Sequence, residues 1–493
     1  MSPTPPPLAS EILETTLLPG REAELERREG GSPPASAEGQ QRTIGFWGAF
    51  SIVAGSMLGI GIFLSPAQMA QQVGSPWVFL GIWAFAGLLV IGGAVAYAEL
   101  GARFPRAGGD YVFHRIAFGP SLAFSTGLSL FGAIFCGSIA AVAVAVFQYQ
   151  LSALLGVDLT QPIPGVGFLS FAQALGCFLV LGITWLNARG VTLSALAQQL
   201  MALTPMVVLF MVALVTLGLW AGGRVPPHIV ATPPPLTVGG LVSAYLAAWF
   251  AYSGWNAVIY VAGEVERPGR NIPRSLLGGS ISIIVLYLLL CVAFIAGLGM
   301  AGLAQSGEAG SALAAAVGGP SASMLMNFLV FLCLISTLNS SVLGGARVAY
   351  AMAKDGAFWK RAGHLHPRSG VPVFALWLQA AISILLILTN QFEDLLKAVS
   401  LAMVLTGTLT VLALFIVRRR EARSGVAAPT EYRAAAWPWL PGLYLVASVV
   451  VVGALLWSVL TGQERANPLV GLVVLVAAWA GHRIWYRHFR VSL

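Results

Sequence analysis

Charged residues are scarce in this sequence. Only 9% of its 493 residues are Asp, Glu, Lys or Arg, and 57% are hydrophobic, whereas soluble domains carry about 25% charged residues. This scarcity excludes a soluble globular protein. Apolar runs of about 18 residues or more, long enough for a helix to cross the hydrocarbon layer, recur about twelve times, so we expect an all-α integral membrane protein with about 12 transmembrane helices. The runs lie near 44–65, 76–101, 115–150, 171–187, 192–220, 239–262, 275–303, 320–352, 372–389, 395–417, 438–460 and 467–486.

Cysteine is rare as well. The four cysteines, Cys136, Cys177, Cys291 and Cys333, lie within these runs without paired spacing, which argues against a disulfide framework or a zinc site. The runs also lack the acid pair or histidine cluster that hydrolysis inside a bilayer requires. We therefore expect no enzyme, and no catalytic residue, metal site or cofactor.

Positive charge is unevenly placed. A net charge of +8 could indicate a nucleic-acid partner in a soluble protein. With both termini cytoplasmic, however, 24 of the 27 Lys and Arg residues fall on the cytoplasmic side, as the positive-inside rule requires. The charges thus predict a multi-pass plasma-membrane protein with cytoplasmic termini and no nucleic-acid partner.

Two regions differ in composition. Residues 1–42 are rich in Pro, Glu, Ser and Gly and cannot bury enough apolar area to offset chain entropy. We expect a disordered cytoplasmic tail there. Short loops join the apolar runs from residue 43 to residue 493, which indicates a single membrane domain.

Glycines interrupt the first and the sixth apolar runs. The interruptions read GSMLGIGIF (55–63) and FAYSGWN (250–256). An unpaired peptide group costs several kcal/mol in hydrocarbon, so opened membrane helices usually serve binding. Matching interruptions in two halves of a chain indicate an inverted repeat with a binding site near the bilayer midplane.

The two interruptions expose opposite ends of peptide dipoles. Gly55, Gly59 and Gly61 would let the backbone leave helical geometry, and the half-helix resuming at Ile62 would present amide N–H groups. The opening at 250–254 would free carbonyl groups. Amide donors and carbonyl acceptors match the two poles of a zwitterion. Close helix packing through small residues is the alternative interpretation.

Longer stretches carry a resemblance. The segment FAYSGWNAVIYVAGEVERPGRNIPRS (250–275) resembles the sixth helix and following loop of L-type amino acid transporters, in the amino acid-polyamine-organocation (APC) superfamily. The stretches YAELGARFPRAGGDY (97–111), LNSSVLGGARVAYAMAKDG (338–356) and HPRSGVP (366–372) agree. This resemblance implies the leucine-transporter-type fold: a 5+5 inverted repeat with broken helices 1 and 6, followed by two further helices.

The resemblance also implies a function. The expected protein is a secondary active transporter, a permease or an exchanger, that moves neutral L-amino acids across the plasma membrane by alternating access. A permease for cationic amino acids or polyamines is the alternative within this class. The sequence also leaves open a second interpretation, a receptor that binds an amino acid without moving it.

Carried over by position, the resemblance implies backbone recognition. The amides of Gly59, Ile60 and Gly61 would bind the substrate carboxylate. The carbonyls of Phe250, Ala251 and Ser253 would bind its amine, with the Phe250 ring as a lid. For Asn339, substrate contact and a helix–helix hydrogen bond are equally expected, and Ser340 is a weaker candidate. The predicted substrate-binding residues are Gly55, Ser56, Gly59, Ile60, Gly61, Phe250, Ala251, Ser253, Gly254 and Asn339.

The side chains expected to line the pocket are Met57, Ile60, Phe250 and Tyr252, which favour aliphatic or aromatic substrates. No charged residue is expected near the middle of a run, because each would cost about 2.5 to 3.5 kcal/mol there. Glu99 and Glu264 fall at cytoplasmic helix ends, where Arg103, Arg347 or Lys354 could pair with them and help to close the inner side.

The sequence departs from the family at three places. Ile60 replaces a small or hydroxyl residue. Helix five lacks the lysine that stands in for a sodium ion in many relatives, and the matching stretch reads Ala202-Leu203-Thr204-Pro205. Proton coupling, sodium coupling and exchange therefore all stay open. The cysteine that joins a heavy subunit would fall within residues 151–170, which contain none, so no disulfide-linked heavy subunit is expected.

Overall fold

The computed structural model describes residues 40–224, 235–389, 392–425, 430–460 and 475–483. Most of the predicted tail, residues 1–39, lies outside this part of the chain. Gln40, within the predicted tail, is buried, and its Nε2 donates a hydrogen bond to Glu264 Oε1 at 3.3 Å. The described chain thus includes the last three residues of the predicted tail, 40–42.

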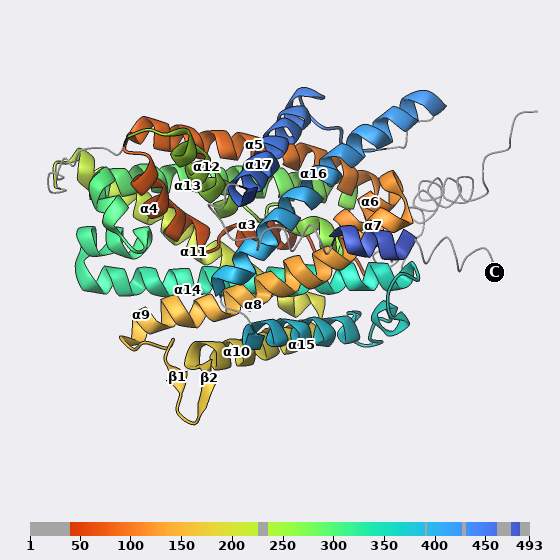
Figure 1. The fold of residues 1–493 in the computed structure, drawn as a ribbon, viewed down its shortest axis with the longest axis horizontal. Helices are drawn as coiled ribbons and strands as arrows, with labels where there is room; N and C mark the ends of the chain where they lie inside the picture. Colours follow the sequence, from red (N-terminus) through yellow and green to blue (C-terminus); the bar gives the residue numbers. More distant parts are fainter. Residues whose placement is uncertain (1–39, 225–234, 390–391, 426–429, 461–474, 484–493) are drawn as a thin grey trace, which may run out of the picture.

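Helices make up nearly all of the described structure (Figure 1). The described residues depart from the expected all-α fold in a two-stranded antiparallel hairpin between the third and fourth spans and in an isolated parallel bridge between Ile44 and Val265. In chain order the elements are α3 (Phe46–Met57), α4 (Gly61–Gln72), α5 (Pro76–Arg103), α6 (Asp110–Phe118), α7 (Pro120–Leu128), η1 (Ser129–Phe135), α8 (Cys136–Ala145), η2 (Val146–Leu151), α9 (Ser152–Leu155), β1 (Pro162–Ile163), β2 (Val166–Ser170), α10 (Phe171–Arg189), α11 (Val191–Ala221), α12 (Val238–Ala251), η3 (Ala257–Glu264), α13 (Pro268–Gln305), α14 (Ala309–Lys354), η4 (Lys360–Gly363), α15 (Val373–Thr389), α16 (Phe392–Ser424) and α17 (Trp439–Leu460).

Eight helical segments of the described chain are long and apolar enough to cross a membrane. They are Phe46–Gln72, Pro76–Arg103, Pro120–Leu155, Phe171–Arg189, Val191–Ala221, Pro268–Gln305, Ala309–Lys354 and Leu401–Ser424. Shorter apolar helices cover Val238–Ala251, Val373–Thr389 and Trp439–Ala454. A multi-pass membrane protein is therefore confirmed. Of the last predicted run, 467–486, only residues 475–483 are described.

Both predicted helix interruptions are present. The first membrane segment opens between α3 and α4 at residues 58–60, where Leu58 has a ψ of 66°. The sixth opens after Ala251 and continues as the 3₁₀ helix η3. Gly254, with a φ of 93°, adopts a conformation that side chains disfavour. Glycine at this position lets the chain turn inside the membrane segment.

The third membrane segment, Pro120–Leu155, is continuous but irregular. It contains two π-helical stretches, η1 and η2, on either side of α8. Such wide turns are rare, and they occur often at functional sites. Since η1 lies opposite both openings, its widened turn shapes the space between them.

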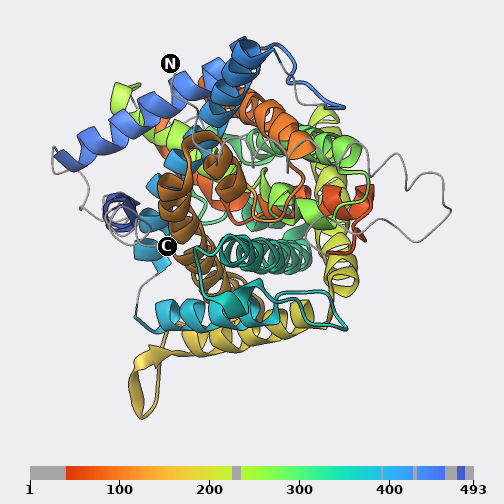
Figure 2. The ribbon, with the colours of Figure 1, turned by 90° about the vertical axis from the view of Figure 1, so that its right-hand side faces the viewer.

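Helix α14 occupies a central position. It packs against α3, α8, α11 and η3, and Figure 2, turned by 90°, shows it nearly end-on near the middle of the ribbon. Gly319, with a φ of 74°, and Pro320 bend it near its start. Beyond that bend its residues from Leu338 to Ala353 are buried. One long helix thus contacts both opened segments.

Candidate substrate site

A cavity of about 150 Å³ lies where the two opened segments face each other. Residues of both openings form one side of it. Side chains from η1, α8, α14 and α16 close the other sides. These include Ile134, Phe135, Ser138, Val142, Thr337, Ser340, Ser341, Met403 and Thr406.

The cavity collects most of the predicted substrate-binding residues. Ser56, Gly59, Ile60, Gly61, Phe250, Ala251, Ser253 and Gly254 line it, as do Met57 and Ser340. Segments far apart in the sequence therefore meet at one place. Gly55 and Asn339 do not line it, and neither does Tyr252.

Gly55 has a packing role. It lies inside α3, one turn before the opening. A Cβ atom at this position would collide with the side chains of Ser336 and Gln198 and would lie 2.8 Å from Ala202 Cβ. Gly55 lets α3 approach α11 and α14, as small residues do at membrane helix interfaces. Its assignment to the opening was wrong.

Asn339 forms the helix–helix hydrogen bonds that the sequence left as an alternative. Its Oδ1 accepts from Asn187 Nδ2 at 2.8 Å, and its Nδ2 donates to Gln198 Oε1 at 2.8 Å. Ser194 Oγ lies 3.3 Å from the same Oδ1. Buried amides without partners are costly, and this network satisfies Asn339 by joining α14 to α10 and α11.

Gln198 is a residue that the sequence did not single out. Its Nε2 donates to Ser336 Oγ at 2.9 Å, to Ser340 Oγ at 2.8 Å and to the Ser51 carbonyl at 3.3 Å. An uncharged amide on α11 thus links α3 with α14. The stretch expected to match the missing lysine begins one turn later, at Ala202, whose methyl packs beside Gly55.

The first opening presents amide donors. The Gly59 N–H bonds the Met57 carbonyl at 2.7 Å, and the Ile60 carbonyl accepts from Phe63 and Leu64. Within the described chain, no backbone or side-chain acceptor takes the N–H groups of Ile60, Gly61 and Ile62. These groups form the N-terminal turn of α4, where the helix dipole favours negative charge.

The second opening presents carbonyl acceptors. The Phe250 carbonyl already accepts from the Ser253 N–H at 3.0 Å. Among the described residues, no donor bonds the carbonyls of Ala251, Tyr252 and Ser253. They lie at the C-terminal end of α12, where the dipole favours positive charge.

The two openings touch each other. A Cβ on Gly61 would lie 2.5 Å from Ala251 Cα, and a Cβ on Gly254 would lie 2.6 Å from the Ser56 carbonyl oxygen. Both glycines are therefore required by the close approach of the two chains. Gly59 differs, because the atom nearest to a Cβ there would be Thr337 Oγ1 at 3.5 Å, an ordinary van der Waals contact.

Tyr252 points away from the cavity. It is fully buried and stacks on Tyr287, with ring centroids 5.1 Å apart, and its ring meets Trp83 edge-on at 5.4 Å. Tyr287 Oη donates to the Met57 carbonyl at 2.6 Å. The prediction that Tyr252 lines the pocket was wrong; it supports the openings from behind, between α5 and α13.

None of the described residues that line the cavity carries a charged side chain. The expected ion pairs lie elsewhere. Arg347 donates from Nε and Nη2 to the two Glu264 carboxylate oxygens at 3.0 and 3.1 Å, and both residues are buried. Glu99 pairs with Arg103 and also with Arg418. Pairing with Arg103 and Arg347 is thus confirmed.

One buried acid was missed in the sequence. Asp110, the first residue of α6, accepts hydrogen bonds from Tyr260 Oη and Thr410 Oγ1, and Asn256 Nδ2 lies 3.5 Å from its Oδ2. Tyr260 and Asn256 line the cavity. Burial raises the pKa of Asp110, while the hydrogen bonds from Thr410 and Tyr260 oppose that rise. The available signal was an acid directly after two glycines, at the start of a helix.

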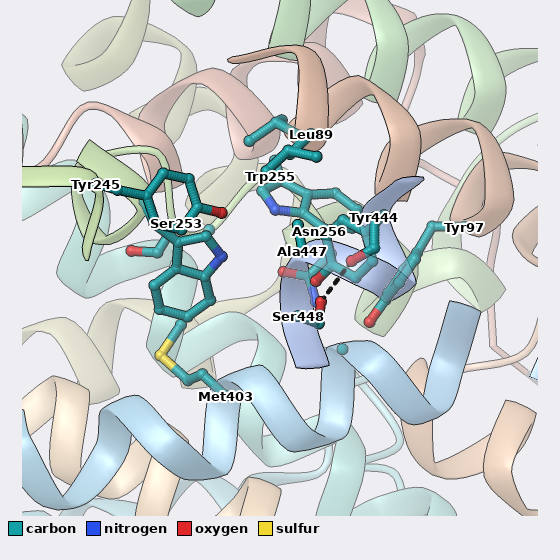
Figure 3. Close-up of a pocket in the computed structure, with 14 residues that line it drawn as sticks. Leu89, Tyr97, Tyr245, Ser253, Trp255, Asn256, Met403, Tyr444, Ala447 and Ser448 are labelled. Carbon is teal, nitrogen blue, oxygen red and sulfur yellow. Dashed lines mark hydrogen bonds between the residues drawn. The ribbon is translucent and has the colours of Figure 1, made fainter. Parts of the chain in front are cut away.

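A second, much smaller cavity of about 40 Å³ lies behind the sixth-segment opening. Ser253, Gly254 and Asn256 line both cavities. Figure 3 shows Trp255 and Asn256 between Tyr245 on one side and Tyr97 and Tyr444 on the other. Trp255 packs edge-on against Tyr97, with ring centroids 4.7 Å apart. The opened segment is therefore a thin partition between two cavities.

Comparisons with known proteins agree with this geometry. A family model described as "Amino acid permease" matches residues 44–479. The serine/threonine exchanger SteT of Bacillus subtilis is 26% identical over 426 residues, covering 85% of this chain and 92% of the relative. The b(0,+)-type amino acid transporter 1 of Mus musculus is 26% identical, covering 77% and 76%. The large neutral amino acids transporter small subunit 2 of Homo sapiens is 25% identical, covering 79% and 73%.

Proposed function

This chain belongs to the amino acid permease family, within the APC superfamily, and from that premise we propose that it carries neutral L-amino acids by alternating access. It is an amino acid transporter and not an enzyme. The proposal adds the substrate class and the mechanism. One observation carries it: free amides and free carbonyls face one uncharged cavity.

The arrangement suits a zwitterion. The N–H groups of Ile60, Gly61 and Ile62 would bind the carboxylate, and the carbonyls of Ala251 and Ser253 would bind the ammonium group. Charge-assisted hydrogen bonds are about twice as strong as neutral ones. Recognition by the backbone leaves the substrate side chain to contact the rest of the cavity.

The lining favours uncharged side chains. Ile134, Phe135 and Val142 form its apolar part, while Ser138 and Ser341 supply hydroxyl groups. A substrate cation or anion would enter this space without a charged partner, which is costly in a low-dielectric site. We therefore propose aliphatic or aromatic amino acids as the preferred substrates, with Phe250 as the lid over them.

The proposed architecture has twelve spans, a 5+5 inverted repeat and cytoplasmic termini in the plasma membrane. The paired interruptions in the first and sixth segments support the repeat, since such breaks mark corresponding positions of the two halves. The single membrane domain would extend over 43–493, behind a cytoplasmic tail. Rocking of one repeat against the other would expose the cavity to each side in turn.

We propose further that no disulfide-linked heavy subunit is needed. The human relative is named a small subunit. In this chain all four cysteines lie within helices, and the described connection between the third and fourth spans contains none. This chain therefore has no cysteine that could form an intermolecular disulfide at the family's position.

Counterflow into proteoliposomes tests the function. The purified chain would be reconstituted with unlabelled leucine, alanine, serine or arginine inside, and uptake of the same labelled amino acid would be followed. We expect counterflow with the neutral amino acids and none with arginine. Counterflow with arginine alone would support a cationic permease instead. Binding without counterflow would indicate a receptor.

A further inference from the structure

We propose that Asp110 is the proton-binding residue of this transporter and couples substrate movement to a proton gradient. This inference rests on the proposed transport function and adds the coupling ion. It starts from the one buried carboxylate whose hydrogen-bond donors line the substrate cavity.

The carboxylate of Asp110 lies directly behind the cavity wall. Its Oδ2 accepts from Tyr260 Oη, and Asn256 Nδ2 lies 3.5 Å from the same atom. Both donors line the cavity and belong to the opened sixth segment. Asp110 itself is 1% exposed and begins α6, a different element. Two donors to the carboxylate therefore belong to the segment that grips the substrate.

The charge of Asp110 has no cationic partner. Among the described residues, no Lys or Arg forms an ion pair with it, whereas buried Glu99 and Glu264 are both paired with arginine. Arg115, the nearest arginine on α6, pairs instead with Asp355 at the end of α14. When a carboxylate is stabilised only by hydrogen bonds, losing one donor raises its pKa.

The titratable groups around Asp110 are uncharged. Tyr97 of α5, Tyr260 of η3 and Tyr444 of α17 face it. From α6 itself, His114 lies one turn further on, and burial lowers its pKa to about 3, so the imidazole is neutral at physiological pH. Among the residues that the structure describes, none of the groups facing Asp110 supplies a compensating positive charge.

A hydrogen-bonded chain leads from Asp110 away from the cavity. Thr410 Oγ1 donates to Asp110 Oδ1 and lies 2.8 Å from His114 Nε2. His114 Nδ1 lies 2.9 Å from Thr126 Oγ1. Every member of this chain is a hydroxyl, a carboxyl or an imidazole that can both accept and release a proton. The chain extends the proton-exchanging groups around the carboxylate as far as Thr126, which is itself buried.

The coupling follows from the donors' location. When η3 moves during alternating access, Tyr260 and Asn256 move relative to α6 and their hydrogen bonds to Asp110 weaken. The pKa of the carboxyl then rises, because the ionised form loses its donors. One proton binds to a carboxylate oxygen in that state and is released when the donors return. Substrate and proton thus share one conformational change.

Accumulation driven by a proton gradient tests the proposal. The full chain would be placed in proteoliposomes, and the amino acid with the strongest counterflow would be offered under an inward proton gradient, an inward sodium gradient or neither. We expect accumulation under the proton gradient and none under the sodium gradient or without a gradient. In Asp110→Asn accumulation falls to the level without a gradient, while counterflow, which moves no net proton, persists.

Matched variants keep the test decisive. Thr410→Val removes a donor to the ionised carboxyl, so we expect the midpoint of pH-dependent uptake to shift to higher pH. Thr408→Val is its control, because Thr408 Oγ1 donates to the Val404 carbonyl oxygen of the same helix at 2.6 Å. Glu308→Gln controls for loss of a partly buried acid, since Glu308 caps α14 by accepting hydrogen bonds from the Gly310 and Ser311 N–H groups and does not line the cavity.

The following outcomes would overturn the proposal that Asp110 binds the coupled proton. Accumulation by Asp110→Asn at the wild-type level overturns the proposal, as does a wild-type protein that shows counterflow but no response to a proton gradient. If Asp110→Asn fails to fold, an unchanged midpoint in Thr410→Val overturns it. Absence of counterflow for every amino acid in the wild type would instead contradict the proposed transport function.

Discussion

At the residue scale, Gly59 and Gly61 differ in a way that permits a clean experiment. A Cβ on Gly61 would press on Ala251 Cα, so Gly61→Leu would disturb folding together with binding. Gly59→Ala leaves the packing intact and places a methyl group beside the free amides. We expect Gly59→Ala to weaken substrate binding about 10-fold, the cost of disturbing one hydrogen bond to a charged group. A scintillation proximity assay measures this affinity.

Gly61→Ala is the matched comparison. Overpacking of this kind costs about 1 to 3 kcal/mol, so we expect a lower melting temperature in detergent, whereas Gly59→Ala melts with the wild type. Normal affinity in a folded Gly59→Ala variant would contradict binding of the carboxylate at this opening.

Gln198 gives a second prediction at this scale. Gln198→Ala removes the nearer of the two acceptors of Asn339 Nδ2, leaving the Ser194 carbonyl at 3.4 Å, and it removes the donor to Ser336 and Ser340. An unsatisfied buried group costs about 1 to 3 kcal/mol, so we expect a clear loss of thermal stability. Gln71→Ala serves as control, since Gln71 donates to the Ala304 carbonyl at an exposed site. Equal melting temperatures for the two variants would show that the network contributes little.

At the scale of elements, the Glu264–Arg347 pair ties η3 to α14. Both side chains are buried, and the pair is bidentate. Removing one partner of a buried pair costs about 3 to 5 kcal/mol, because the other charge stays uncompensated. We therefore expect Arg347→Met to be strongly destabilised in thermal unfolding, and Glu264→Gln combined with Arg347→Met to recover part of the loss.

The Arg115–Asp355 pair provides the control for that prediction. Its side chains are 41% and 27% exposed, and pairs open to solvent contribute about 0 to 1 kcal/mol. Arg115→Met should therefore melt close to the wild type. A double variant no more stable than Arg347→Met alone would argue against an uncompensated charge as the cause.

At the scale of the whole molecule, the orientation in the membrane can be measured. In a background without the four cysteines, Thr160→Cys places a thiol on the exposed connection between the third and fourth spans, and Lys360→Cys places one on the exposed connection after α14. The positive-inside rule puts only the first of these outside the cell. We expect a membrane-impermeant maleimide to label Thr160→Cys in intact cells and Lys360→Cys only after permeabilisation.

Counterflow by the cysteine-free protein is the control for folding. Labelling of Lys360→Cys in intact cells would reverse the proposed orientation. Labelling of both positions would contradict the number of spans between them.

The sequence alone determined the membrane class, most of the spans, both interruptions and the family. Hydropathy, positive charge and glycine act within one helix or one loop, so they can be read along the chain. Backbone groups freed at 58–60 and 251–253 were predictable for the same reason, because helix ends leave their peptide groups unpaired wherever they occur. That reasoning located Gly59, Ile60 and Ala251 without knowledge of their neighbours.

Only the tertiary structure decided what each side chain touches. Gly55 and Asn339 pack between helices because α11 approaches α3 and α14 at those positions. Tyr252 packs against Trp83, and Asp110 is buried against Tyr260 and Thr410. These partners lie up to 300 residues away along the chain, and contacts over such separations depend on how the helices pack, which no local pattern encodes.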